Sequence, residues 1–171
     1  MKQLSIFAKS MSEETQHVTH PDYWKLCVDG AARNNPGPAG AGIAILKNDQ
    51  IESTYGFYLG KKTNNQAEYL ALVIGLIVLQ QKIQQTDLVL VLSDSELLVK
   101  QIKGEYRVKH PELKPLHTVA KKILASMSYD IAHVVREDNV LADAMANKGV
   151  DEKIALTPAC LRMLHHYELS L

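Results

Sequence analysis

The hydrophobic period of the chain changes repeatedly along its length, and these changes limit the folds that it can adopt. Residues 23–28 alternate between two dissimilar faces, and residues 42–46 and 51–59 follow as short apolar segments, a pattern that predicts strands. Across residues 64–80 apolar side chains recur every three to four positions, which predicts an amphipathic helix. Residues 88–92 form a continuous apolar run, which is typical of a strand covered on both faces.

The second half of the chain continues in alternation. We expect short helices over residues 95–102, 111–126 and 139–148, and a last strand over residues 131–135. Three strands in a meander, followed by helices and strands in turn, predict an α/β fold with a mixed sheet and helices on its faces.

The length of 171 residues suits one domain. We expect this domain to span residues 21–150. An N-terminal extension over residues 1–20 would precede it, and a C-terminal extension over residues 151–171, with a helix around 159–167, would follow. Because Met1 begins the chain and no polymerase segment precedes the domain, we expect a protein that acts alone.

Composition excludes several classes of protein. Nineteen basic residues balance nineteen acidic ones, which argues against binding nucleic acid by bulk charge alone, although acids at a metal site can hide a basic groove in the total. Two cysteines are too few for a disulfide framework or a zinc site. No apolar run approaches the ~18 residues of a membrane span, so we expect a cytoplasmic protein with no membrane partner.

Four acidic residues stand at the edges of the predicted elements. They are Asp29, Glu68, Asp94 and Asp143. Each has a structural explanation when it is taken alone, as a turn residue, a helix-terminal acid, a helix cap or a solvated position. However, the first strand and the buried strand are expected to be neighbours whose carboxyl ends meet at one sheet edge, which would bring Asp29 beside Asp94. Such carboxylates, with no His or Cys beside them, suit Mg²⁺ or Mn²⁺, and a carboxylate cluster that holds two such ions hydrolyses phosphodiesters.

Four segments, in this order, resemble the motifs of type 1 ribonucleases H. These segments are residues 28–40 (VDGAARNNPGPAG), 63–69 (TNNQAEY), 93–99 (SDSELLV) and 136–147 (REDNVLADAMAN). The resemblance covers about residues 23–147. It implies the ribonuclease-H-like fold, with a five-stranded mixed sheet in the order 3-2-1-4-5. It also implies an endonuclease that cuts the RNA strand of RNA–DNA hybrids and leaves 5′-phosphate and 3′-hydroxyl ends.

The resemblance also assigns roles to the four acids. Asp29 is expected to bridge two Mg²⁺ ions, which Mn²⁺ could replace. Asp143 would share the ion that activates the attacking water, and Glu68 and Asp94 would share the ion that faces the leaving 3′ oxygen. The expected partner is an RNA–DNA hybrid bound by a monomer.

Substrate contacts follow from the same motifs. Asn35, Asn64 and Asn65 correspond to positions that contact the RNA around its 2′-hydroxyls, the group that separates RNA from DNA. Their alternative explanation is turn and cap formation. Thr63, with Asn65, matches a pocket for a phosphate of the DNA strand, at the start of a helix that already favours an anion. Glu96 replaces a Gln that contacts the substrate in many relatives, so it can accept but cannot donate a hydrogen bond.

Two departures from the family leave alternatives open. The basic helix and loop of some members, their handle, is missing, because residues 104–110 lead directly to the next helix. The His-bearing loop of some members also has no counterpart in residues 136–139, and His133 is expected to be a packed strand residue. Another nuclease of the same fold and a non-catalytic hybrid-binding module are the alternatives. The matched RNA-contacting motifs disfavour the first, and the four retained acids disfavour the second.

Overall fold

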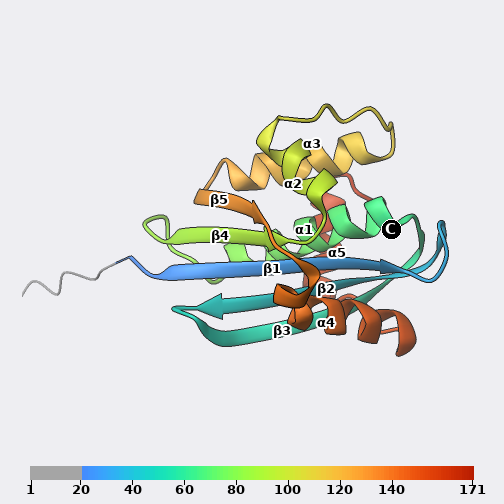
Figure 1. The fold of residues 1–171 in the computed structure, drawn as a ribbon, viewed down its shortest axis with the longest axis horizontal. Coiled ribbons are helices and arrows are strands. Elements are labelled where there is room, and N and C mark those ends of the chain that lie inside the picture. The colour runs from blue at the N-terminus through green and yellow to red at the C-terminus, as the bar shows by residue number, and fades with distance from the viewer. Residues whose placement is uncertain (1–20) are drawn as a thin grey trace, which may run out of the picture.

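Five strands form one mixed sheet in the order β3-β2-β1-β4-β5 in the computed structural model, which describes residues 21–171 (Figure 1). The strands are β1 (Tyr23–Ala32), β2 (Gly37–Lys47), β3 (Gln50–Lys62), β4 (Leu88–Ser93) and β5 (Ser128–His133). The first three pair antiparallel, whereas β1, β4 and β5 run parallel. The expected fold class and strand order are therefore confirmed. The predicted N-terminal extension over residues 1–20 lies outside the described residues.

Helices connect and cover the strands. They are α1 (Asn64–Gln80), α2 (Glu96–Lys103), α3 (Leu113–Leu124), α4 (Val140–Asp151) and α5 (Pro158–His166), with a 3₁₀ turn, η1 (Arg136–Asp138), before α4. Within residues 21–171, the segment between α2 and α3 contains no helix. None of the helices in this part of the chain is both long enough and apolar enough to cross a membrane.

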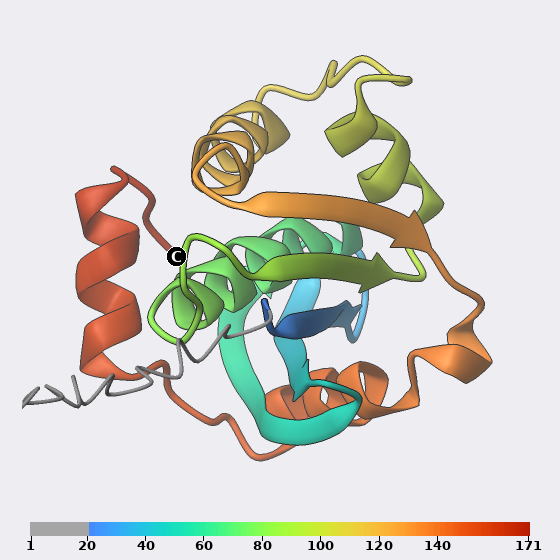
Figure 2. The same cartoon turned by 90° about the vertical axis from the view of Figure 1, so that its left-hand side faces the viewer.

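The sheet is covered by α1 on one face and by α4 on the other (Figure 2). Leu26 and Val28 of β1 point toward α1, whereas Cys27 packs with Ala142 of α4. The approach of α4 requires a glycine in β2, because a Cβ on Gly42 would lie 1.9 Å from the carbonyl oxygen of Ala142. The two helices thus fix the sheet from both sides around β1.

The predicted helix over residues 64–80 is confirmed at both ends as α1. Its N-terminus is closed by a capping box in which the Thr63 hydroxyl accepts from the Gln66 N–H at 3.2 Å, and the Gln66 side chain accepts from the Thr63 N–H at 2.8 Å. Two donors that a helix start leaves unpaired are thereby satisfied. This capping box sets the position of the first helical turn, which carries Glu68.

The predicted end of the first strand is wrong. The glycines and prolines of residues 31–40 also indicate a loop, but only residues 33–36 lie outside the strands. β1 continues to Ala32 and β2 begins at Gly37, so Asp29 pairs with Gly42 inside the sheet. Both glycines of this segment belong to β2. A Cβ on Gly40 would lie 2.4 Å from the Ala146 carbonyl oxygen of α4, whereas a Cβ on Gly37 would meet Asn34.

Two further expectations about strands are corrected. The run over residues 88–92 is not covered on both faces: Leu88 is 48% exposed, and burial alternates along β4 because α4 lies mainly over β1, β2 and β3. The last strand is Ser128–His133 rather than residues 131–135, and His133 at its end is exposed rather than packed. In the C-terminal segment, Cys160 and Leu164 of α5 belong to the main core.

Candidate active site

Three of the four predicted acids meet where β4 ends beside the C-terminal half of β1. Val28 of β1 pairs with Ser93 of β4 in parallel register, so the residues that follow, Asp29 and Asp94, lie side by side. Glu68 reaches the same place from α1, and carboxylate oxygens of the three residues lie within 4.8 Å of one another. Asp29 and Glu68 are buried, and Asp94 is partly buried. We call Asp29, Glu68 and Asp94 the three-carboxylate cluster.

Glu68 is held in place by the backbone of β1. Its Oε2 accepts a hydrogen bond from the Gly30 N–H at 3.1 Å. A Cβ on Gly30 would lie 2.2 Å from the Glu68 nitrogen, so only glycine allows α1 to pack this closely on β1. The glycine that follows Asp29 in the sequence is therefore what brings Glu68 to Asp29.

Asp94 is oriented by Asn139, the residue before α4. The Asn139 side chain is 1% exposed, and its Nδ2 donates both to Asp94 Oδ1 at 3.1 Å and to the Val28 carbonyl at 2.9 Å. This amide joins β1 to the carboxylate that follows β4. The Asp94 carbonyl also contacts the exposed ring of His133, at 3.2 Å from Nε2.

Asp143, the fourth predicted acid, lies outside the three-carboxylate cluster. Its Oδ1 forms an ion pair with the guanidinium of Arg136, and its Oδ2 accepts from Asn147 Nδ2 at 3.3 Å. Asn147 in turn accepts from Arg33 Nη1 at 2.8 Å. A cationic side chain thus holds Asp143 at the edge of the cluster.

The acids repel one another in a region that is largely shielded from water. Burial, followed by repulsion from Asp94 and Asp143, raises the pKa of Asp29 to about 7. Burial, followed by repulsion from Asp29, raises the pKa of Glu68 well above its usual value, while the Gly30 N–H and Arg136 oppose this rise. Closely spaced carboxylates of this kind are stabilised by a cation, and an all-oxygen donor set suits a hard divalent ion such as Mg²⁺.

The cluster opens into a cleft of about 360 Å³. The cleft is lined by residues of all four motifs, among them Arg33, Asn64, Ser95, Arg136 and Asn147. Asn35 and Asn64, two of the predicted RNA contacts, are exposed and joined, because Asn35 Oδ1 accepts from the Asn64 N–H at 3.0 Å. Asn35 therefore helps to cap α1, and the two residues stand at one rim.

The remaining predicted contacts lie around this rim. Thr63 is the N-cap of α1, and Asn65 is exposed in its first turn. Glu96 begins α2, is exposed, and forms an ion pair with Lys100 at 2.6 Å. That ion pair lowers the pKa of Glu96, so its carboxylate is an acceptor at neutral pH.

Four residues at the site were not predicted individually. They are Arg33, Arg136, Asn139 and Asn147. All four stand within the recognised motifs, but their residue types fit an exposed loop or helix face equally well. Arg33 and Asn139 contact residues far away in the sequence. Arg136 and Asn147 contact Asp143 within one motif, but these contacts depend on the path of the 3₁₀ turn and of α4.

Comparison with known proteins places the chain in a family. A family model described as reverse transcriptase-like matches residues 27–149. Ribonuclease HI of Halobacterium salinarum is 36% identical over 126 residues, which are 72% of this chain and 62% of that relative. This chain therefore spans somewhat less than two thirds of that protein.

Solved structures agree with this placement. The crystal structure of RNase H1 from Halobacterium salinarum superposes with a TM-score of 0.72 at 34% identity, covering 76% of this chain and 98% of that one. LC11-RNase H1, solved in complex with an RNA/DNA hybrid, has a TM-score of 0.70 at 36% identity and covers 77% of this chain and 97% of that one. With its matching strand order and motifs, this chain belongs to the type 1 ribonuclease H family.

Proposed function

We propose that this protein is an endonuclease that hydrolyses the RNA strand of RNA–DNA hybrids. The observation that carries the proposal is the three-carboxylate cluster, whose oxygens lie within 4.8 Å at the floor of an open cleft. A buried set of acids this close is costly unless it serves to hold a cation. The similarity to LC11-RNase H1, which was solved with a hybrid, supports the choice of substrate.

The cofactor that we propose is Mg²⁺, with two ions per site when substrate is bound and with Mn²⁺ as a substitute. Asp29 would contact both ions, Glu68 and Asp94 one of them, and Asp143 the other. When bound, the ions would lower the pKa of the attacking water and neutralise charge on the leaving oxygen. The products would carry 5′-phosphate and 3′-hydroxyl ends.

The remaining residues of the site would orient these ligands. The Gly30 N–H holds Glu68, and Asn139 holds Asp94 and ties it to β1. Until a metal ion binds, Arg136 pairs with Asp143 and lowers the pKa of Asp29, and so supplies positive charge that the ions would later replace. In this account Arg136 and Asn139 are positioning residues.

Selectivity for RNA is assigned to the rim of the cleft. Asn35, Asn64 and Asn65 would contact successive 2′-hydroxyls, since an amide can both donate and accept and a hydroxyl needs both. Glu96 would accept from a further 2′-hydroxyl. Thr63, with Asn65, would bind a phosphate of the DNA strand at the N-terminus of α1, where the helix favours an anion.

One assay tests this proposal. The purified protein is incubated with end-labelled hybrid, duplex RNA, duplex DNA and single strands, with and without Mg²⁺. We expect cleavage of the RNA in the hybrid alone, and only with Mg²⁺. Cleavage of duplex DNA would favour another nuclease of the same fold, and tight hybrid binding without cleavage would favour a binding module.

A further inference from the structure

The side chain of Arg33 joins the turn between β1 and β2 to the helix α4. Its Nη1 donates to Asn147 Oδ1 at 2.8 Å, and its Nε and Nη2 donate to Asp151 Oδ1 at 3.2 and 2.7 Å. Asn147 and Asp151 lie one helical turn apart on α4, so the planar guanidinium contacts both at once. Figure 1 shows this turn and the C-terminal end of α4 at the same end of the molecule. Arg33 is therefore held by two residues of one helix.

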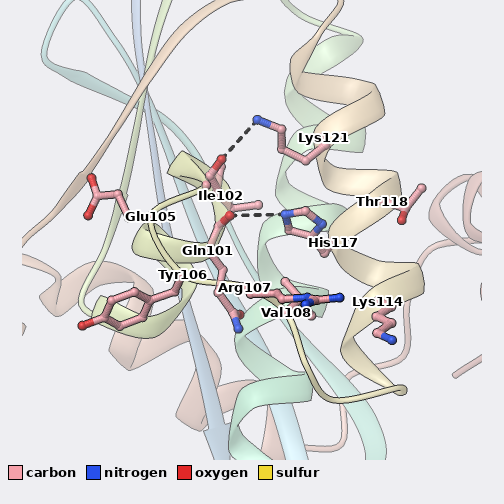
Figure 3. Close-up of a pocket in the computed structure, with 11 residues that line it drawn as sticks. Gln101, Ile102, Glu105, Tyr106, Arg107, Val108, Lys114, His117, Thr118 and Lys121 are labelled. Atoms are coloured by element: carbon pink, nitrogen blue, oxygen red, sulfur yellow. Dashed lines mark hydrogen bonds between the residues drawn. The ribbon is translucent and has the colours of Figure 1, made fainter.

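These contacts differ from the capping of a helix by cationic side chains. At the end of α2, Lys121 Nζ donates to the Ile102 carbonyl at 3.1 Å (Figure 3). His117 Nε2 lies 3.3 Å from the Gln101 carbonyl. Such contacts cover carbonyls that the end of a helix leaves unpaired. The hydrogen bonds of the Arg33 guanidinium reach side chains instead, so they fix how those side chains are oriented.

The amide of Asn147 transmits this orientation to Asp143. Its Nδ2 donates to Asp143 Oδ2 at 3.3 Å and to the Asp143 carbonyl at 2.8 Å. A side-chain amide has an oxygen that accepts and a nitrogen that donates. Because Arg33 donates to the oxygen, the nitrogen faces Asp143. An amide turned over would place its oxygen against the carboxylate and its nitrogen against the guanidinium, so Arg33 selects the orientation in which Asn147 binds Asp143.

Both ends of this set of contacts are fixed by the fold. The backbone N–H of Arg33 donates to the Pro38 carbonyl at 2.8 Å across the turn between β1 and β2. The helix α4 packs so closely on β2 that a Cβ on Gly40 would lie 2.4 Å from the carbonyl oxygen of Ala146, the residue before Asn147. The backbones that carry Arg33 and Asn147 are therefore held at a set distance from each other.

Asn147 can hold Asp143 while a metal ion is bound. Asp143 Oδ1 pairs with Arg136, whose side chain is 72% exposed. A divalent ion that binds Asp143 would compete with this exposed guanidinium. The contact with Asn147 uses the other oxygen, Oδ2, and the carbonyl of the same residue. Asn147 would thus remain as a partner of the carboxylate after Arg136 has been displaced.

We propose that three residues form a relay that positions Asp143 for the metal ion. They are Asp151, Arg33 and Asn147. This inference rests on the proposed function, in which Asp143 is a ligand of one ion. Asp151 fixes the guanidinium, the guanidinium orients the amide, and the amide holds the carboxylate. Arg33 and Asn147 are positioning residues in this account, and partners of this kind contribute to the affinity for the metal.

The direction in which Arg33 changes metal affinity tests the relay. Mn²⁺ binding is measured by calorimetry in the absence of substrate. Arg33→Ala should lower the affinity about two- to tenfold, the change that corresponds to one hydrogen bond. If Arg33 acted by its charge alone, its removal would raise the affinity, because a cation repels Mn²⁺. Lys148→Ala, the matched control, removes a cation from an exposed position of α4 and should not lower the affinity.

Two outcomes of this titration would overturn the proposal. They are an unchanged or higher affinity in Arg33→Ala, and an equal loss in Lys148→Ala.

Double-mutant cycles show whether Arg33 acts through Asn147. Asn147→Ala should lower the Mn²⁺ affinity about tenfold or more, and the addition of Arg33→Ala should lower it no further, because the amide that Arg33 orients is gone. Additive losses would reject the relay. Thermal unfolding establishes that each variant is folded. If Asn147→Ala does not fold, Asp151→Ala takes its place in the cycle: it should lower the affinity in the wild-type background and have no effect in the Arg33→Ala background.

Hybrid cleavage separates this inference from the proposed function. Arg33 also lines the cleft, so its variant is assayed for the KM of the hybrid and for the Mn²⁺ concentration that gives half-maximal cleavage. Arg33→Ala should raise the Mn²⁺ requirement and leave the KM unchanged. A raised KM with an unchanged Mn²⁺ requirement would mean that Arg33 binds the hybrid, and would reject the relay. A wild-type protein that does not cleave the hybrid would reject the proposed function, whereas the Mn²⁺ titrations would still decide the relay.

Discussion

Arg136 and Asp143 form an ion pair at the edge of the three-carboxylate cluster. The pair holds the fourth acid of the site apart from Asp29, Glu68 and Asp94, and the guanidinium also lowers the pKa of Asp29 and Glu68. Arg136 therefore supplies, from the protein itself, part of the positive charge that this group of acids requires. A divalent cation at the site would compete with it for Asp143.

Arg136 competes with a metal ion for Asp143, so its removal should make metal binding tighter. Arg136→Ala should raise the affinity for Mg²⁺ by up to about fivefold, since exposed ion pairs contribute about 0.2–1 kcal/mol. Calorimetric titration with Mg²⁺ in the absence of substrate measures the change. Arg162→Ala, at an exposed position of α5, is the control and should leave the affinity unchanged. Weaker Mg²⁺ binding by Arg136→Ala would show that Arg136 supports the site rather than competing for it.

The raised pKa of Asp29 predicts how stability depends on pH. Its pKa rises from 3.8 to about 7 on folding, so the folded state binds the proton more tightly than the unfolded state. In buffer without divalent ions, the free energy of unfolding should fall as the pH rises from about 4 to about 7, with about 1.4 kcal/mol at stake for each unit of pKa difference. The free energy of unfolding of Asp29→Asn should not fall in this way, so this variant should be more stable than the wild-type protein above pH 7.

Denaturant unfolding between pH 4 and pH 8 checks this expectation. The difference between the two proteins should shrink toward pH 4 and should also shrink when Mg²⁺ is added at pH 8, because the ion binds the carboxylate but not the amide. A wild-type protein that is as stable as Asp29→Asn at every pH would contradict this account of burial and repulsion.

The side chain of Asn139 should affect metal affinity as well as the stability of the fold. Asn139→Ala removes two hydrogen bonds and leaves the Val28 carbonyl without this partner, which costs about 1–3 kcal/mol for a buried group. It should also weaken Mn²⁺ binding about 10- to 100-fold, the usual effect of losing a residue that orients a ligand. Unfolding and Mn²⁺ titrations measure the two effects separately. A loss of stability without any change in Mn²⁺ affinity would leave Asn139 with a structural role only.

The residues at the rim of the cleft lead us to expect that cleavage requires a minimum number of consecutive ribonucleotides. If Asn35, Asn64 and Asn65 contact successive 2′-hydroxyls, a single ribonucleotide within duplex DNA should be cut poorly or not at all, whereas runs of about four or more should be cut well. A series of duplexes with one to six consecutive ribonucleotides measures this dependence. Efficient incision at an isolated ribonucleotide would mean that these residues do not recognise the RNA in this way.

The sequence predicted best those elements whose signals are local. α1 was predicted to the residue because its apolar positions follow a helical period, and the capping box of Thr63 and Gln66 that closes its start is also a local feature. The end of β1 was not predicted correctly, because Asp29 and Gly30 have the composition of a turn. Only tertiary structure shows that Gly30 is a strand residue that admits Glu68, and that Gly42 admits α4.

The residues of the site likewise divide into those that the sequence predicted and those whose contacts depend on tertiary structure. The parallel pairing of β1 and β4, inferred from the order of elements, was sufficient to predict Asp29 beside Asp94. The ion pair of Asp143 with Arg136 could not be inferred, since it depends on the path of the 3₁₀ turn before α4. The bridge that Asn139 makes between Val28 and Asp94 joins segments 111 and 45 residues away from it in sequence.

The central claim, that the three-carboxylate cluster holds the catalytic metal, is tested most directly by Asp29→Asn. Hybrid cleavage in Mg²⁺ and hybrid binding are measured on the same preparations of wild-type and variant protein. Cleavage should fall at least about a hundredfold, beyond the 10- to 100-fold typical of residues that only orient a metal ligand, while the fold and hybrid binding remain largely intact. An Asp29→Asn protein that keeps a tenth or more of wild-type cleavage would contradict the account.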